Sequence, residues 1–150
     1  MNEEINTTFI GEVVDYKNQK ATVKPLIERR YVDGSTLTPQ NIPNVPVMML
    51  SGGGAIIKVP IKKGDNVLCI CTKQSLDEWL AGGLRSIQSI DRQFNSADVV
   101  AIPGLINFKD SVLGGDNDNL EILYSGASII IDEAGQVNIN DGNLTIDSGV

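Results

Sequence analysis

The sequence predicts an all-β protein in two parts. The first is a small barrel with one short helix over residues 1–110, and the second is a narrow, repetitive β segment over residues 111–150. Apolar and polar side chains alternate in short runs along much of the chain, as strands with one buried face require. Glycine is plentiful at 15 residues and aromatic residues are few at 5%, which is typical of strands joined by many turns. The excess negative charge is confined to the second part.

The strand signals of the first part follow one another at irregular intervals, as in a small barrel. We expect strands over residues 9–16, 21–27, 45–50, 56–60, 67–72 and 99–102. Turn residues at 17–19, 51–54 and 63–65 separate them, and a long loop is expected around Asp33-Gly34 and residues 39–43. Proline and glycine at 103–104 end the last strand.

A single short helix is expected between the last two strands of the barrel. Ser75 resembles an N-cap and Glu78 is at the third helical position, which together form a capping box. Leu76, Trp79 and Leu80 share one face of this helix, and we expect them to pack on the barrel. Strands in this order with one helix before the last give the outline of an OB-type barrel.

The second part differs from the first in charge. Residues 1–110 hold 12 acidic and 12 basic residues, whereas residues 111–150 hold 7 acidic residues and no basic ones. Apolar-x-apolar triplets recur there at an almost constant period and are separated by Asp/Asn-Gly or Ala-Gly turns. The triplets are formed by Ile129, Ile131, Val137, Ile139, Leu144 and Ile146. This pattern predicts a repetitive β array with one apolar face.

One chain cannot bury that apolar face, because a few narrow strands make too little core. Several copies could bury it by facing these Ile, Val and Leu rows toward a shared axis. Closure around an axis would also hide strand edges that invite aggregation. We therefore expect an oligomer with these six residues at its axis.

No catalytic or cofactor-binding constellation emerges from the residue types. The chain has no histidine, so the commonest general base and metal ligand is missing. Cys69 and Cys71 lie two apart in an apolar run, where they make a poor disulfide and an incomplete zinc site. The glycines at 52–54 lack the spacing of a phosphate loop, and the Asp/Asn-rich runs at 116–119 and 138–143 do not fit a calcium loop. We expect no enzyme, no cofactor and no bound metal.

Nucleic-acid binding is the alternative from a different functional class. OB-type barrels often bind single strands through aromatic residues in a basic groove. Basic residues do cluster in sequence at Lys17, Lys20, Lys24, Arg29 and Arg30, with Tyr16 and Tyr31 beside them. The barrel is neutral overall, however, and the acidic second part would repel a phosphate backbone.

The N-terminus and the most apolar stretch bear on where the protein is made. Met1-Asn2-Glu3-Glu4 is acidic and leads into no apolar core region, so we expect no signal peptide. The stretch at 45–61 contains prolines, a lysine and three glycines and is too broken to span a bilayer. We expect a chain that is soluble when made in the cytoplasm.

An ordered set of segments resembles the N-terminal domain of central spike proteins from contractile phage tails. The set covers residues 9–105 and consists of Val23-Lys24-Pro25-Leu26-Ile27, Ile42-Pro43-Asn44-Val45-Pro46-Val47, Gly52-Gly53-Gly54, Pro60-Ile61-Lys62-Lys63-Gly64-Asp65, Ser75-Leu76-Asp77-Glu78-Trp79-Leu80 and the close at 98–104. The repeats after Leu120 are similar to the start of that family's β-helical spike.

The resemblance implies a homotrimer and a mechanical role. An OB-fold collar would contact the hub and tube proteins of the baseplate, and a three-chain β-helix would point at the cell and help pierce the host outer membrane on contraction. A hub or spike component of a bacterial contractile injection system is a close alternative, since sequence does not separate the two.

One departure from the family concerns the tip. Many such spikes end in a point where histidines hold an iron, and this chain has no histidine. Four to six strand layers would also give a stalk of only about 20–30 Å. We therefore expect a separate tip protein beyond Val150; the alternative is that the chain is a shortened form of a longer spike.

Overall fold

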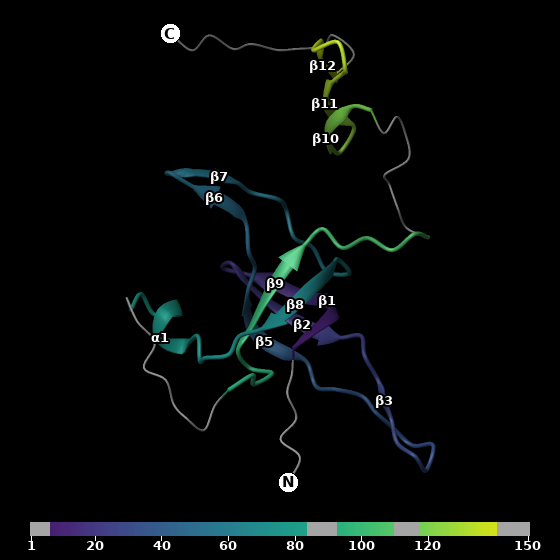
Figure 1. Cartoon of the computed structure of the whole chain (residues 1–150), viewed down its shortest axis with the longest axis vertical. Coiled ribbons are helices and arrows are strands. Elements are labelled where there is room, and N and C mark those ends of the chain that lie inside the picture. Colours follow the sequence, from purple (N-terminus) through teal and green to yellow (C-terminus); the bar gives the residue numbers. More distant parts are fainter. Residues whose placement is uncertain (1–6, 84–92, 110–117, 141–150) are drawn as a thin grey trace. The chain divides into compact units, whose positions relative to one another are not determined.

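The computed structural model of the chain describes residues 7–83, 93–109 and 118–140 (Figure 1). Strands make up 47% and helix 4% of the structure, which confirms the prediction of a β protein. The chain divides into two compact units, Met1–Asn107 and Phe108–Val150. The roles expected of the two parts, a collar and a stalk, stay predictions.

The first unit is built on a curled sheet of five strands: β1 (Thr8–Lys17), β2 (Lys20–Pro25), β5 (Ile42–Pro46), β8 (Asn66–Cys71) and β9 (Val99–Pro103). Their order in the sheet is β5-β2-β1-β8-β9, and each neighbouring pair is antiparallel. The two outer strands approach each other, since Val47 forms a parallel bridge with Ala101 and the Met48 N–H donates to the Ala101 carbonyl at 2.8 Å. The sheet therefore forms a half-barrel (Figure 1).

The core lies on the concave face of this sheet and is made of small and β-branched residues. Strand alternation places every second side chain inside. The buried residues are Val13, Ala21, Val23, Ile42, Val45, Val67, Cys69, Cys71, Val99 and Ala101, with Phe9, Tyr16, Val47 and Ile61 packed against them. Gly11 also lies on this face of β1, where a side chain would meet Val23 and the Cys69 Sγ. The absence of a Cβ at Gly11 lets β1 and its neighbours pack closely.

Two short hairpins leave the barrel. Strand β3 (Arg29–Arg30) pairs with β4 (Thr36–Leu37), and β6 (Leu50–Gly52) pairs with β7 (Ala55–Ile57). The strand predicted over 45–50 is wrong, because the sheet pairing of β5 ends at Pro46 and β6 begins only at Leu50. The loop predicted around 33–43 contains β4 and the start of β5. Alternation in the run after Val45 does not reveal that the chain leaves the sheet there.

The expected helix is present as one turn, α1 (Asp77–Leu80), but the predicted capping box is wrong. The N-cap residue is Leu76, whose side chain makes no capping hydrogen bond. Ser75 Oγ only accepts from the Asp77 N–H at 3.4 Å. Instead the Leu76 N–H donates to the Asp98 carboxylate at 3.1 Å, and Asp98 comes 22 residues later in the chain. Asp98 is 1% exposed, so this bond fixes the helix to the buried start of β9.

The second unit contains a three-stranded antiparallel sheet. Its strands are β10 (Leu120–Tyr124), β11 (Ala127–Ile131) and β12 (Val137–Ile139), in that order. A two-residue turn joins β10 to β11, and both of its residues, Ser125 and Gly126, have positive φ, as the twist of a tight hairpin favours. The turn between β11 and β12 is closed by Asp132, whose Oδ1 accepts from the Gln136 N–H at 2.8 Å.

Candidate assembly surfaces

One face of the three-stranded sheet in the second unit is wholly apolar. In an antiparallel pair, residues directly opposite each other project to the same face. The pairs Leu120–Ile131, Ile122–Ile129 and Tyr124–Ala127 join β10 to β11, and Ile129–Ile139 and Ile131–Val137 join β11 to β12. We call this surface the apolar face; it consists of Leu120, Ile122, Tyr124, Ala127, Ile129, Ile131, Val137 and Ile139.

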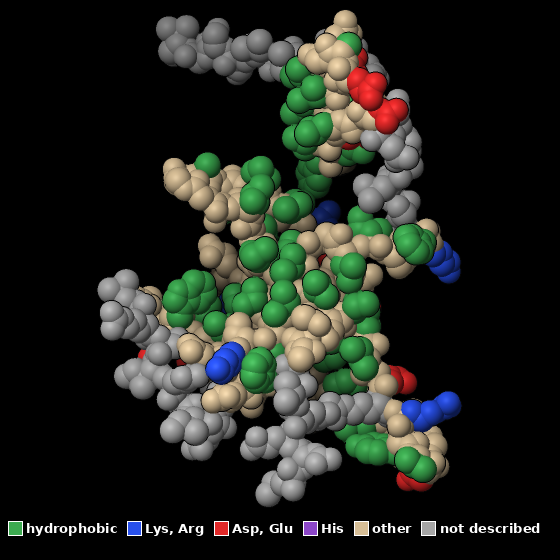
Figure 2. Space-filling view, in the orientation of Figure 1, with side chains coloured by type: hydrophobic (Ala, Val, Ile, Leu, Met, Phe, Trp, Pro, Cys, Tyr) green, Lys and Arg blue, Asp and Glu red, His purple; other side chains and the backbone are tan. Residues whose placement is uncertain are grey.

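The apolar face is open to solvent in the single chain. All of its members except the half-buried Ile139 are exposed, and Ile122 reaches 59%. The face carries no charged side chain. Figure 2 shows hydrophobic side chains gathered along one side of this unit and carboxylates along another. Contiguous exposed apolar surfaces are common at interaction sites of proteins, so this face is a candidate for one.

The opposite face of the same sheet is mixed. It carries Glu121, Leu123, Ser128, Ile130 and Asn138. On this mixed face Ser128 and Ile130 are half-buried, whereas the three strands leave the apolar face uncovered. At one end Asn140, with positive φ, turns back so that its Oδ1 accepts from the Ser128 N–H at 2.8 Å. The sheet therefore has one purely apolar side and one partly polar side.

The structure brings together the described part of the predicted axis set. Ile129, Ile131, Val137 and Ile139 lie on the apolar face, whereas Leu144 and Ile146 lie outside the described residues. Their role at an oligomer axis stays a prediction. The sequence reasoning missed Leu120, Ile122 and Tyr124, which extend the face across β10. The signal was present only in part: Glu121 separates Leu120 from Ile122, but the apolar Leu123 between Ile122 and Tyr124 breaks the alternation.

The second predicted set, on α1, lies against the barrel only in part. Leu76 is half-buried, and with Leu80 it lines a surface pocket of about 630 Å³ whose other wall includes Ile42 and Pro43 of β5. Trp79 is 58% exposed, so it is not a core residue of the single chain. Its alternative role, as an interface anchor, stays a prediction.

The basic residues of the first unit are spread over separate elements. Lys17 and Lys20 face each other across the β1–β2 turn, where Asn18 and Gln19 both have positive φ. Lys24 is opposite Glu12 on β1, and Arg30 belongs to the β3–β4 hairpin. Opposite charges on directly paired strand positions attract, so Lys24 has a carboxylate beside it. The sheet register thus does not gather these cations into one uninterrupted strip.

The two cysteines are buried small side chains on the core face of β8. Both are free thiols, as expected. Burial raises the pKa of the Cys69 thiol to about 11, and burial together with the nearby Asp98 carboxylate raises the pKa of Cys71. Both thiols therefore stay protonated near neutral pH, where they are poor nucleophiles and poor metal ligands.

Acidic and thiol side chains do not converge on a metal site within residues 7–83, 93–109 and 118–140. In the same ranges, none of the helical segments has the length and apolar composition that crossing a membrane requires. Of the two Asp/Asn-rich runs weighed for calcium, only parts are described: Asp118 and Asn119 precede β10, and Asn138 and Asn140 lie at β12.

Comparison with known proteins gives one result for the first unit. A search of curated proteins found no match. A comparison with protein families matches residues 10–104 to the family described as phage protein Gp138 N-terminal domain. The matched segment begins at the third residue of β1 and ends just after β9, so it contains parts or all of every strand of the curled sheet. Because it covers more than half of the chain, this protein belongs to the family of the phage protein Gp138 N-terminal domain.

Proposed function

We propose that this chain is the trimeric central spike of a contractile phage tail baseplate and that it helps to pierce the host outer membrane on contraction. Three copies would sit below the tail tube. In each copy the first unit would act as an OB-fold collar that contacts hub or tube proteins, and the second would contribute to a β-helical stalk. The role is mechanical, so the protein needs stability and shape and is not an enzyme.

The family membership supports the general part of this proposal. The matched family is a phage protein domain, which favours a structural protein of the virion. The architecture of the first unit supports the collar, because an OB-fold is a five-stranded, partly open barrel. Here five strands curl until the outer two are joined through Val47 and Ala101.

The exposed apolar face is the observation that carries the proposal. Burying a large aliphatic side chain contributes roughly 1.5–3 kcal/mol, and this face presents six Leu, Ile and Val side chains together with Tyr124. A closed cyclic arrangement would turn the face of every copy toward one axis. The acidic residues would then lie toward water, where mutual repulsion is screened by salt.

Two alternative functions can be distinguished from the proposed one by experiment. A bacterial contractile injection system would use the same trimer, and the genes beside this one would distinguish it from a phage. A single-stranded nucleic-acid binder would show salt-sensitive binding to an oligonucleotide. We expect no binding at low salt, since Lys24 is directly opposite Glu12 in the strand register and the second part is acidic.

The proposal is tested on the particle itself. Purified particles are labelled with a gold-conjugated antibody against this chain and viewed by electron microscopy. We expect label at the baseplate end of the tail, with antibody against the capsid protein as the positional control. Label on the capsid, or absence of the chain from purified particles by mass spectrometry, would refute the proposed location.

A further inference from the structure

A second exposed apolar element lies in the first unit, at the β6–β7 hairpin. Leu50 and Ile57 are directly opposite each other and share one face of the hairpin, and they are 72% and 62% exposed. Gly53 and Gly54 form its two-residue turn, both with positive φ. Strands β6 and β7 contact each other and no other strand or helix of the described residues. Figure 1 shows this hairpin standing clear of the curled sheet.

An isolated hairpin of this length is marginal in water. A hairpin with large aliphatic side chains on its surface therefore needs a partner to bury them. The sequence around it is free of charge, since no acidic or basic residue lies between Asp33 and Lys58. The partner surface should accordingly be apolar and uncharged.

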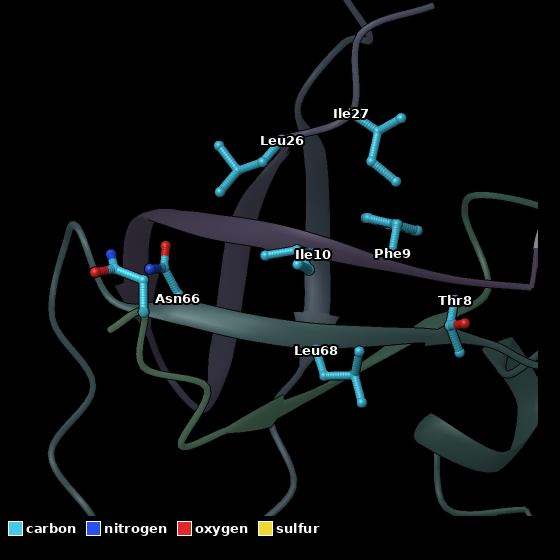
Figure 3. A pocket seen from close by; sticks show the side chains of 8 residues that line it. Thr8, Phe9, Ile10, Leu26, Ile27, Asn66 and Leu68 are labelled. Carbon is cyan, nitrogen blue, oxygen red and sulfur yellow. The ribbon is translucent and has the colours of Figure 1, made fainter. Parts of the chain in front are cut away.

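The same unit carries a surface with these properties on the outside of its sheet. A pocket of about 510 Å³ is lined by Thr8, Phe9, Ile10, Leu26, Ile27, Asn66, Leu68 and Asn107, none of which is charged (Figure 3). We call it the outer pocket. In Figure 3, Leu26 and Ile27 lie on one side of Ile10 and Leu68 lies on the other. Ile10, Leu26 and Ile27 are all exposed.

Paired strands form the centre of the outer pocket. Ile10 is directly opposite Leu68, and Leu68 is opposite Ile102 on the next strand, so an apolar row continues across the outer face of the sheet. The Leu26 N–H donates to the Ile10 carbonyl at 2.9 Å, which fixes the chain as it leaves β2. One wall of the pocket is therefore built on the paired strands β1 and β8, and the other is formed by Leu26 and Ile27, where the chain leaves β2.

Charges at the borders of the two surfaces are complementary. The cation Lys58 follows Ile57 directly, and the anion Glu28 follows Ile27 directly. Both are exposed. If the hairpin of one copy enters the outer pocket of another, an ammonium and a carboxylate come to the rim of an otherwise uncharged contact, which is the arrangement typical of protein interfaces.

We infer that the β6–β7 hairpin of each copy docks through Leu50 and Ile57 into the outer pocket of the neighbouring copy. The inference rests on the proposed trimer. A contact between two different surfaces of one chain is heterologous, and it closes into a ring when its rotation fits the symmetry. The barrels would then be joined to one another independently of the apolar face of the second unit.

The test uses cysteine pairs on separate full-length chains. Chains with Ile57→Cys are co-expressed with chains that carry Leu26→Cys, and the purified mixture is treated with a short bifunctional maleimide. We expect a covalent dimer on a denaturing gel, which is absent when each variant is treated alone. Chains with Val32→Cys, at another exposed position, replace the Leu26→Cys chains in the matched control. The wild type reports any reaction of the buried Cys69 and Cys71.

Light scattering on the same samples separates the two proposals. A trimer that gives no specific cross-link would overturn the docking contact and leave the proposed function standing, with the outer pocket then open to another protein. A monomer would overturn both. Cross-linking within a single chain that carries both cysteines, without any between chains, would show that the hairpin folds onto its own barrel and would also overturn the inference.

Discussion

At the scale of single residues, Gly11 shows why the sheet of the first unit can curl so tightly. It is directly opposite Pro25 on β2 and Val67 on β8, at the centre of the sheet. A Cβ at this position would overlap the Cγ1 atom of Val23 and come within 3.2 Å of the Cys69 Sγ. Both neighbours are fully buried core residues and have little room to move.

The first prediction is that Gly11→Ala destabilises the protein by about 1–3 kcal/mol, because overpacking a filled core forces side chains from their preferred rotamers. Urea denaturation followed by circular dichroism measures the free energy of unfolding. Gly52→Ala is the control, since a Cβ there meets nothing within 4 Å. Equal losses in the free energy of unfolding for the two substitutions would show that a Cβ at Gly11 does not crowd the core.

Asp98 provides a second residue-scale prediction. Its carboxylate accepts the Leu76 N–H, so Asp98→Ala leaves a donor at the helix start without its acceptor, at a cost of about 1–3 kcal/mol. Ser75→Ala should change the free energy of unfolding by less than about 0.5 kcal/mol, because its contact is long and exposed. Both are measured by urea denaturation. A larger loss in the free energy of unfolding for Ser75→Ala than for Asp98→Ala would support the capping box and contradict this prediction.

The third prediction concerns the thiols and pH. Since burial raises the pKa of Cys69 from 9.0 to about 11, its thiolate fraction at pH 8 is about 100-fold below that of an ordinary thiol. Iodoacetamide at pH 8 should label the native protein slowly and the urea-unfolded protein fast. The folded-state pKa is the higher one, so this group favours the fold below pH 9 and the contribution is lost as pH rises toward 11. Rapid labelling of the native chain would contradict the buried position.

At the scale of elements, the decisive feature is the two-sided chemistry of the β10–β12 sheet. Ile139 is on the apolar face, and the adjacent Asn138 is exposed on the other. These neighbours offer a matched pair, because an aspartate at either adds one negative charge to the same strand. Only the side of the sheet differs.

The fourth prediction is that Ile139→Asp breaks assembly, whereas Asn138→Asp does not. A carboxylate forced into an apolar interface without a partner costs about 3–5 kcal/mol. Analytical ultracentrifugation at several protein concentrations measures the association of each variant. If Ile139→Asp assembles as well as Asn138→Asp, the wrong face has been assigned to the interior.

Much of the element order could be predicted because strand alternation is a local signal. The strands predicted over residues 9–16 and 99–102 lie within β1 and β9. The strand predicted over 67–72 lies within β8 except for its last residue. The β6–β7 hairpin could not be told from sheet strands, since aliphatic residues that face a core and those that face a partner look alike in sequence. The Asp98–Leu76 bond also escaped prediction, because 22 residues separate its partners and no local pattern links them.

Of the two assembly surfaces, the apolar face could be predicted in part and the outer pocket could not. Period-2 alternation placed Ile129, Ile131, Val137 and Ile139 on one face before the register was known. The outer pocket was not foreseen, because it is formed by β1, β8 and the exit from β2, which become neighbours only when the sheet forms.

At the scale of the whole molecule, the proposed function requires that the chain not exist alone. Its core is small and β-branched, while large aliphatic side chains lie exposed on the apolar face and on the β6–β7 hairpin. Such a distribution is typical of a protomer, whose surfaces are completed by other copies.

The mass of the purified full-length chain tests this requirement most directly. Each chain has a mass of 16.1 kDa, so multi-angle light scattering on the wild type should give a trimer of about 48 kDa. The mass should persist on dilution, because the contacts of three copies would bury the apolar face. A stable species of 16.1 kDa would contradict the account, since the apolar face would then remain in water.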